Sequence, residues 1–155
     1  MLNRKVLVLL AAGGSAAVLL GALYFQFFED LPPCKLCIWQ RWPHVAAVGI
    51  GLAALAIGGR LLPLAGALAA LCTGAVGLYH TGVERDWWQG PTSCTGSQSI
   101  TEMSPAQAAE LIMNMAIQRC DDVLWSFLGL SMASWNALAS LAFALIWIAA
   151  ARRSR

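Results

Sequence analysis

The sequence predicts an all-α membrane protein: a four-transmembrane-helix bundle with a short interfacial amphipathic helix in its second outer loop. Composition is the first reason, because 59% of the 155 residues are hydrophobic and only 12% are charged, a balance unlike that of soluble domains. The length of the apolar runs is the second, because a helix needs about 20 residues to cross a hydrocarbon core. The four expected helices are 6–28, 43–59, 61–83 and 123–151. The chain length suits one domain, 1–155.

Charged side chains divide between the two ends of these expected helices. Basic residues gather at the ends that we expect to be cytoplasmic, at Arg4, Lys5, Arg60, Arg152, Arg153 and Arg155. All the acidic residues lie in the other two loops, 29–42 and 84–122. The bias of Lys and Arg predicts cytoplasmic termini and two loops on the outer face. The net charge of +2 is the sum of these two ends and does not indicate binding of nucleic acid.

The first expected helix, 6–28, contains no charged residue. It is too long for the apolar part of a signal peptide, so we interpret it as retained in the membrane. Tyr24 and Phe28 near its end are typical of the membrane interface. Pro32 and Pro33 then disfavour further helix, which defines the first outer loop.

The second helix is expected to begin between Cys37 and Pro43, because proline fits the first turn of a helix and disrupts its interior. The third carries Cys72 in mid-membrane, which we interpret as a small buried hydrophobe. His80 lies near the outer end of the third helix. Two interpretations of His80 stay open: a hydrogen-bonded structural residue, or a partner of something bound at the depth of Arg41.

The second outer loop, 84–122, has two parts. A small, polar segment around Cys94 is typical of an exposed loop. A serine–proline cap at Ser104 then predicts an amphipathic helix of about four turns, too polar to span and so placed in the interface. This helix would return Cys120 to the membrane surface, close to the first outer loop.

Cysteines are concentrated on the same outer side. Four of the five lie in the outer loops: Cys34, Cys37, Cys94 and Cys120. Such a distribution indicates an oxidising compartment. Cys34 and Cys37 form a C-x-x-C pair, which can close as a disulfide or open to a low-pKa thiolate. In a helix Arg41 lies one turn beyond Cys37, where its charge would stabilise a thiolate or an anionic ligand.

Two dithiol pairs on one side of a membrane predict electron relay by thiol–disulfide exchange. The pair in the exposed loop can meet a soluble protein dithiol. The C-x-x-C pair at the lipid boundary can meet an apolar oxidant, and a quinone dissolved in the bilayer suits that depth. Arg41 would stabilise the developing quinone anion, with His80 as a second candidate. The step needs no metal.

The chain resembles the DsbB family of disulfide-generating membrane proteins over nearly its whole length. The motifs that carry the resemblance are Cys34-Lys35-Leu36-Cys37 with Gln40-Arg41, Cys94 and Cys120 in the second outer loop, and Trp-x-Phe-Leu-Gly-Leu-x-Met at 125–132. The resemblance implies a quinone-dependent protein-dithiol oxidase of the bacterial inner membrane. Its cofactor would be ubiquinone or menaquinone, and its partner a DsbA-like periplasmic thiol oxidase.

The resemblance also implies roles for individual residues. Cys94 would form the mixed disulfide with the partner, and Cys120 would resolve it or pass electrons toward Cys34. Three residues would lie at the quinone: Cys37, Arg41 and His80. The segment before Cys94 departs from the family, because it is polar where the family tends to offer apolar residues to the partner. Trp87 and Trp88 are candidates to supply that contact.

Three alternatives stay open at this point. One is a quinone-linked bundle like the epoxide reductases, in which the quinone-facing C-x-x-C lies on a later helix. The second is a four-cysteine zinc site, although Cys94 and Cys120 are far apart and form no second close-spaced motif. The third is a non-enzymatic membrane subunit with two structural disulfides. The sequence leaves the disulfide pairing and the particular quinone open.

Overall fold

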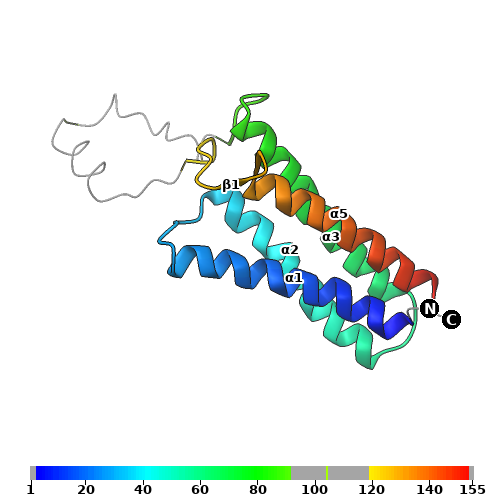
Figure 1. Cartoon of the computed structure of the whole chain (residues 1–155). Helices are drawn as coiled ribbons and strands as arrows, with labels where there is room; N and C mark the ends of the chain where they lie inside the picture. The colour runs from blue at the N-terminus through cyan, green and yellow to red at the C-terminus, as the bar shows by residue number, and fades with distance from the viewer. Residues whose placement is uncertain (1–2, 92–103, 105–118, 154–155) are drawn as a thin grey trace.

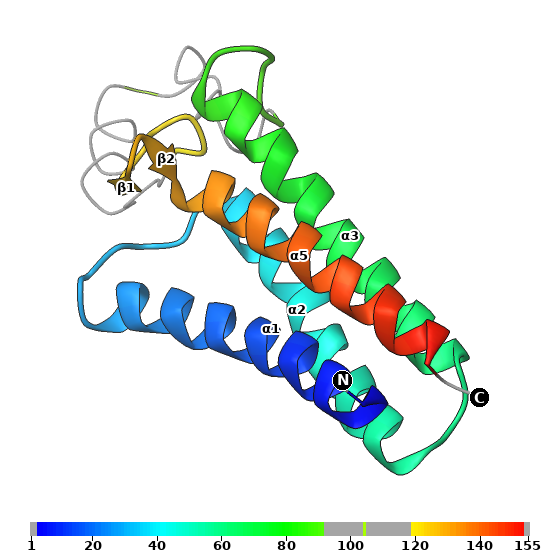
Figure 2. The ribbon, with the colours of Figure 1, turned by 45° about the vertical axis from the view of Figure 1, so that its right-hand side comes forward.

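The computed structural model describes residues 3–91, 104 and 119–153. Within them, helices form α1 (Arg4–Phe27), α2 (Lys35–Ala56), α3 (Leu61–Glu84) and α5 (Met132–Arg152), and two short strands form β1 (Ser126–Phe127) and β2 (Leu130–Ser131). The four helices pack side by side in an elongated bundle (Figure 1). In both views α1 begins and α5 ends at the end that holds the α2–α3 connection (Figures 1 and 2). The C-x-x-C pair lies at the opposite end, where α2 begins.

Helices α1, α3 and α5 are each long and apolar enough to cross a membrane. Large apolar side chains cover their outward faces, for example Leu20, Leu68 and Leu145. These observations confirm a helical membrane protein. Helix α2 is less apolar because the first half of its sequence carries charged and polar side chains, so it does not meet the same standard.

Small residues let the helices approach closely in the half of the bundle that is remote from the C-x-x-C pair. Trp147 of α5 is 0% exposed and packs against Gly66 of α3, where a Cβ atom would lie only 2.6 Å from its ring. A Cβ on Gly51 of α2 would clash with the side chain of Ala12 in α1. Close backbone contact of this kind is the usual basis of helix association in lipid.

Arg4 fastens the start of α1 to the end of α2. Its guanidinium donates to the carbonyl oxygens of Ala54 at 2.8 Å and Ile57 at 3.0 Å, which belong to the last turn of α2 and its C-cap. These carbonyls have no partner within the helix, so a cation that binds them stabilises the helix end. Gly59 adopts φ +93 in the following turn, a conformation that glycine adopts without strain.

The prediction for the start of the second helix was wrong. Helix α2 begins at Lys35 because Cys34 serves as its N-cap, with extended backbone angles and a sulfur that accepts a hydrogen bond from the Cys37 backbone N–H. Pro43 therefore lies inside the helix rather than in its first turn. The helix also ends at Ala56, before the expected residue 59.

The last helix was also predicted to begin too early. It starts at Met132, and the segment before it forms an antiparallel hairpin in which β1 pairs with β2. Leu128 and Gly129 form the turn of this hairpin, both with positive φ, as a tight two-residue turn requires. Ser131 then caps α5 by accepting a hydrogen bond from the backbone N–H of Ser134. Hydropathy alone could not separate this apolar hairpin from the helix that follows.

Two features of the second outer loop lie outside the described residues. They are the expected interfacial amphipathic helix and Cys94. The described start of this loop folds back on α3: the Trp88 ring stacks on Tyr79 and its indole N–H donates to the Tyr79 carbonyl at 2.9 Å. Trp87 is the more exposed of the two tryptophans proposed as partner contacts.

Candidate active site

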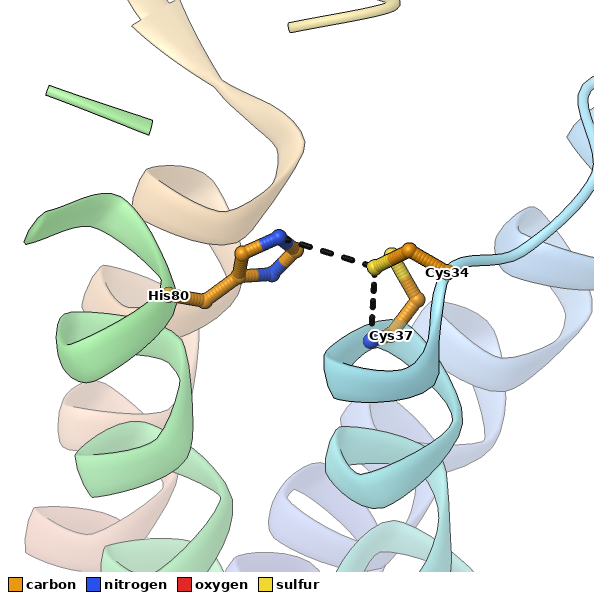
Figure 3. A group of neighbouring side chains, drawn as sticks. All are labelled: Cys34, Cys37 and His80. Carbon is orange, nitrogen blue, oxygen red and sulfur yellow. Dashed lines mark hydrogen bonds between the residues drawn. The ribbon is translucent and has the colours of Figure 1, made fainter. Parts of the chain in front are cut away.

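The Cys34–Cys37 pair is organised by the N-terminus of α2. The Cys34 thiol lies 2.8 Å from the Cys37 sulfur, to which it donates, and it accepts a hydrogen bond of 3.1 Å from the Cys37 backbone N–H. Figure 3 shows the two sulfur atoms side by side, with His80 reaching toward them from α3. A disulfide bond is about 2.05 Å long, so a small movement of either side chain would close it. The local geometry therefore suits a reversible dithiol.

His80 joins the pair to the segment that carries Cys120. Its Nε2 lies 3.6 Å from the Cys34 sulfur and 3.1 Å from the Cys120 carbonyl oxygen, and its Nδ1 lies 2.9 Å from the Gln40 amide nitrogen. Because that amide donates to Nδ1, the ring proton belongs on Nε2, which donates to both Cys120 and Cys34. His80 thus fixes the Cys34 sulfur relative to the chain that returns from the second outer loop.

Cys120 is the third cysteine at this end of the bundle. It is 0% exposed and packs in one cluster with Cys34, Leu36 and Val83, and Cys37 lies against that cluster. The structure therefore brings together Cys34, Cys37, Cys120 and His80, four residues that the sequence analysis singled out. Their catalytic roles stay predictions.

Cys34 is the thiol that holds its proton in this arrangement. Its pKa lies above the ordinary cysteine value because of hydrogen bonding with Cys120 first, then with Cys37, and because of burial. The hydrogen bond from the Cys37 N–H acts in the opposite direction and does not outweigh them. With Cys34 donating its S–H to Cys37, the developing negative charge of the dithiol belongs on Cys37.

Arg41 lies one helical turn beyond Cys37, as its spacing predicted. Its guanidinium donates to the Gln26 amide oxygen at 2.6 Å and to the Ala22 carbonyl at 3.3 Å, both on α1. Among the described residues no carboxylate forms an ion pair with Arg41. Its charge is therefore held in place by neutral groups and is available to an anion. Gln26 was not predicted from the sequence, because no motif distinguishes it from other residues near the end of an apolar helix.

A cavity of about 540 Å³ opens beside these residues, within the size range of small-molecule sites. Side chains of α1 and α5 form much of its wall, where the two ribbons diverge (Figure 2). Its lining is mainly apolar. The polar residues in the lining include Cys37, Gln40, Arg41, His44, His80 and Asn136. The combination of apolar walls and a few convergent polar groups suits a flat, apolar ligand with polar atoms on its ring.

Buried polar side chains, several of which also line the cavity, form a connected network. The Asn136 amide of α5 donates to the Gln40 side-chain oxygen at 2.8 Å, and the Thr73 hydroxyl of α3 donates to the Gln40 carbonyl at 2.9 Å. Nε2 of His44 in α2 lies 2.8 Å from the side-chain oxygen of Asn136. Satisfied networks of this kind fix the relative positions of helices. His44 was not among the residues singled out from the sequence.

Cys34, Cys37 and His80 could also be considered as metal ligands, because their ligand atoms lie within 4.8 Å of one another. A metal would need the His80 Nε2 lone pair. That nitrogen carries its proton toward the Cys120 carbonyl, so the hydrogen bonding favours thiol chemistry. The absence of a metal stays a prediction. The fifth cysteine, Cys72, differs from the expectation in being exposed on the outer face of α3 rather than buried.

The fold and the site define a helical membrane protein with a dithiol centre at one end of its bundle. The family described as "Disulfide bond formation protein DsbB" matches residues 4–150, so the chain belongs to the DsbB family. Family membership confirms the resemblance seen in the sequence and indicates disulfide-forming oxidoreductase activity.

Individual relatives agree with this assignment. The chain is 31% identical to the disulfide bond formation protein B of Azoarcus sp. (strain BH72), covering 99% of this chain and 96% of the relative. It is 31% identical to that of Hahella chejuensis, covering 81% and 80%. It is 33% identical to that of Pasteurella multocida, covering 90% and 84%. No solved structure matches the chain.

Proposed function

We propose that the protein reoxidises a DsbA-like, thioredoxin-like dithiol protein of the periplasm and passes the two electrons to a quinone of the inner membrane. The electrons would travel through Cys94 and Cys120 and then through Cys34 and Cys37. The observation that carries the proposal is the meeting of Cys120, the C-x-x-C pair and a largely apolar cavity at one end of a membrane bundle.

Exchange would proceed with sulfur–sulfur bonds formed and broken in pairs. A partner thiolate attacks Cys94 in a Cys94–Cys120 disulfide and releases Cys120, which attacks Cys34 and releases the Cys37 thiolate. The second partner thiol then attacks the mixed disulfide, so the partner leaves oxidised and Cys94 is released. Cys94 attacks Cys120 and restores the first disulfide, leaving Cys34 and Cys37 as a dithiol.

The cavity residues fit a quinone. Its apolar walls, with Val18, Leu19 and Phe25 among them, match the ring and tail, and Arg41, which the Gln26 side chain holds in place, offers a positive charge at this wall. A quinone supplies an acceptor for two electrons and two protons. Cys37 would give the electrons from its thiolate, Arg41 would favour the negative charge that develops, and His80 would hold Cys34 in place. Ubiquinone and menaquinone both fit this description.

The proposal includes a topology of four spans, in which α2 crosses the membrane together with α1, α3 and α5. Both termini would be cytoplasmic and the cysteine end periplasmic. Its support is the charge distribution along the bundle: Arg4, Arg60 and Arg152 lie at one end, and Glu29, Glu84 and Asp121 belong to the other.

The test is quinone reduction, followed by absorbance, with purified protein in detergent and a reduced thioredoxin-like dithiol protein. We expect Cys37→Ser and Cys94→Ser each to abolish reduction, because each breaks the relay. Cys72→Ser is the matched control, since this cysteine lies on the outer face of α3, away from the cavity. If no periplasmic dithiol protein supports quinone reduction by the wild type, the cysteines form structural disulfides instead.

A further inference from the structure

The β1–β2 hairpin is an exposed apolar segment that the proposed relay does not use. The side chain of Leu128 at its tip is 77% exposed, and Phe127 beside it is exposed as well. No charged residue occurs in 123–151, which includes the hairpin and nearly all of α5. An exposed apolar patch of this kind usually marks a surface that contacts a protein, a ligand or a membrane.

Contacts with the neighbouring helices place the hairpin at the depth where the bundle leaves the hydrocarbon core. The ring centroid of Trp125 lies 5.4 Å from that of Phe25, close to the end of α1. The centroid of Phe127 lies 6.3 Å from that of Trp135, close to the start of α5, and Figure 2 shows both strands beside this helix start. Helix α5 has 21 residues, and at about 1.5 Å per residue it already spans the core. The hairpin therefore lies level with the helix ends, at the membrane interface.

The two faces of the hairpin differ in polarity. Ser126 pairs with Ser131, and Phe127 pairs with Leu130. Residues directly opposite each other in an antiparallel pair share a face, so one face carries two serines and the other two apolar side chains. The serine face continues into polar structure, because the Ser131 hydroxyl donates to the Glu84 carboxylate. A hairpin with one polar and one apolar face suits the boundary between water and acyl chains.

Leu128 is an unusual residue for the turn. Its φ of +52 lies in the left-handed region, which favours Asn or Gly in tight hairpins and is uncommon for a bulky side chain. The turn alone does not explain a leucine there, whereas contact with lipid does. The backbone beside the tip is also suited to lipid: the Trp135 indole N–H donates to the Phe127 carbonyl at 3.1 Å, so this carbonyl needs no water.

We propose that the β1–β2 hairpin inserts its tip into the phospholipid layer at the cysteine end of the bundle. Leu128 and Phe127 contact acyl chains, and Ser126 lies on the side of the headgroups. This surface continues the outward face of α5, where Leu145 is exposed. Because Trp125 and Phe127 also line the cavity, the inserted hairpin holds that wall of the cavity at the membrane surface. The inference concerns phospholipid and does not depend on the proposed relay.

The first test measures what surrounds individual positions of the hairpin. Nitroxide labels are attached to Leu128→Cys and Ser126→Cys, and to Leu145→Cys as a reference for lipid, in the full-length protein with its five own cysteines replaced by serine. The protein is placed in nanodiscs of phosphatidylethanolamine and phosphatidylglycerol. Electron paramagnetic resonance then compares collisions with oxygen, which concentrates among acyl chains, and with a nickel chelate, which stays in water. We expect the oxygen-to-nickel ratio at position 128 to be severalfold higher than at position 126 and similar to that at position 145.

A second measurement keeps the native cysteines. Leu128→Trp and Ser126→Trp each add one indole to the full-length protein, in nanodiscs with or without lipids brominated in the upper part of their acyl chains. Bromine quenches indole fluorescence on contact, and subtraction of the wild-type signal leaves the added residue. We expect the fluorescence added by Leu128→Trp to be quenched severalfold more than that added by Ser126→Trp.

Equal oxygen-to-nickel ratios at positions 128 and 126 would overturn the inference, because both faces of the hairpin would then have the same surroundings. Equal quenching of the two added tryptophans would overturn it for the same reason. Low accessibility of position 128 to both oxygen and nickel would overturn it as well, since protein rather than lipid would then cover the tip. Each of these results leaves the proposed function intact, because neither measurement involves thiol exchange or quinone.

Discussion

The two ends of the bundle are filled in different ways. Near the start of α1, the Trp147 side chain of α5 is fully buried and packs directly against the backbone of α3 at Gly66. Near the start of α2, the space between helices holds a polar network and a cavity of about 540 Å³. Contacts between small residues at the first end hold the helices closely together. At the second end, hydrogen bonds position the helices and leave room for a ligand.

This difference separates residues that maintain the fold from residues that act on a ligand. A substitution at the cavity end is expected to change the reaction more than the stability. A substitution at the packed end is expected to do the reverse.

Arg41→Met should give the largest effect, on activity. We expect kcat/KM for quinone reduction to fall about a hundredfold, because the charge that favours the developing anion is lost. Arg41→Lys is the matched variant: it keeps the charge and loses the fork that binds both Gln26 and Ala22, so it should be intermediate. The measurement is the initial rate of quinone absorbance change. An unchanged rate in Arg41→Met would remove the residue from the reaction.

Gly66→Ala should lower stability by about 1–3 kcal/mol, because its methyl group would overlap the enclosed Trp147 ring. Gly13→Ala is the control, since a Cβ at Gly13 meets no atom within 4 Å. The readout is the midpoint of thermal unfolding in detergent, with quinone reduction measured on the folded protein at low temperature. Equal midpoints for the two variants would contradict the close approach of α3 to α5.

The smallest effect concerns pH. The Arg119 guanidinium beside Asp121 holds the pKa of that carboxyl below its usual value. A depressed pKa stabilises the folded state at neutral pH, and this contribution is lost as the pH falls from the ordinary carboxyl value, about 3.9, through the depressed one. The pair is largely exposed, so Arg119→Gln should change the thermal midpoint only slightly at pH 7. If Arg119→Gln lowers the thermal midpoint strongly at pH 7 and equally at pH 3, Arg119 stabilises the fold by something other than its ion pair with Asp121.

Much of the architecture could be predicted because hydropathy and charge carry it directly. The apolar runs predicted the positions of α1 and α3 to within one or two residues, and the spacing of Cys37 and Arg41 placed them on one face. The start of α2 was missed because a cysteine thiol caps it, and cysteine is not among the usual N-cap residues. The hairpin before α5 was missed because it is as apolar as the helix.

The candidate site was predicted in part. Cysteines and an arginine near a membrane surface stand out in a sequence because they are costly or reactive there. The partners that orient them do not stand out. Gln26 and His44 matter through contacts with residues far away in the chain, and such contacts follow only from how the helices pack.

In the proposed reaction, the C-x-x-C pair itself delivers electrons to quinone. The most direct measurement uses the variant in which Cys94 and Cys120 are both serine, reduced and then given quinone under anaerobic conditions without any partner protein. Free thiols and quinone absorbance are counted together, with Cys72 as the thiol that stays reduced. We expect two thiols to disappear for each quinone reduced. If the quinone stays oxidised while Cys34 and Cys37 remain free thiols, the pair does not deliver electrons to quinone.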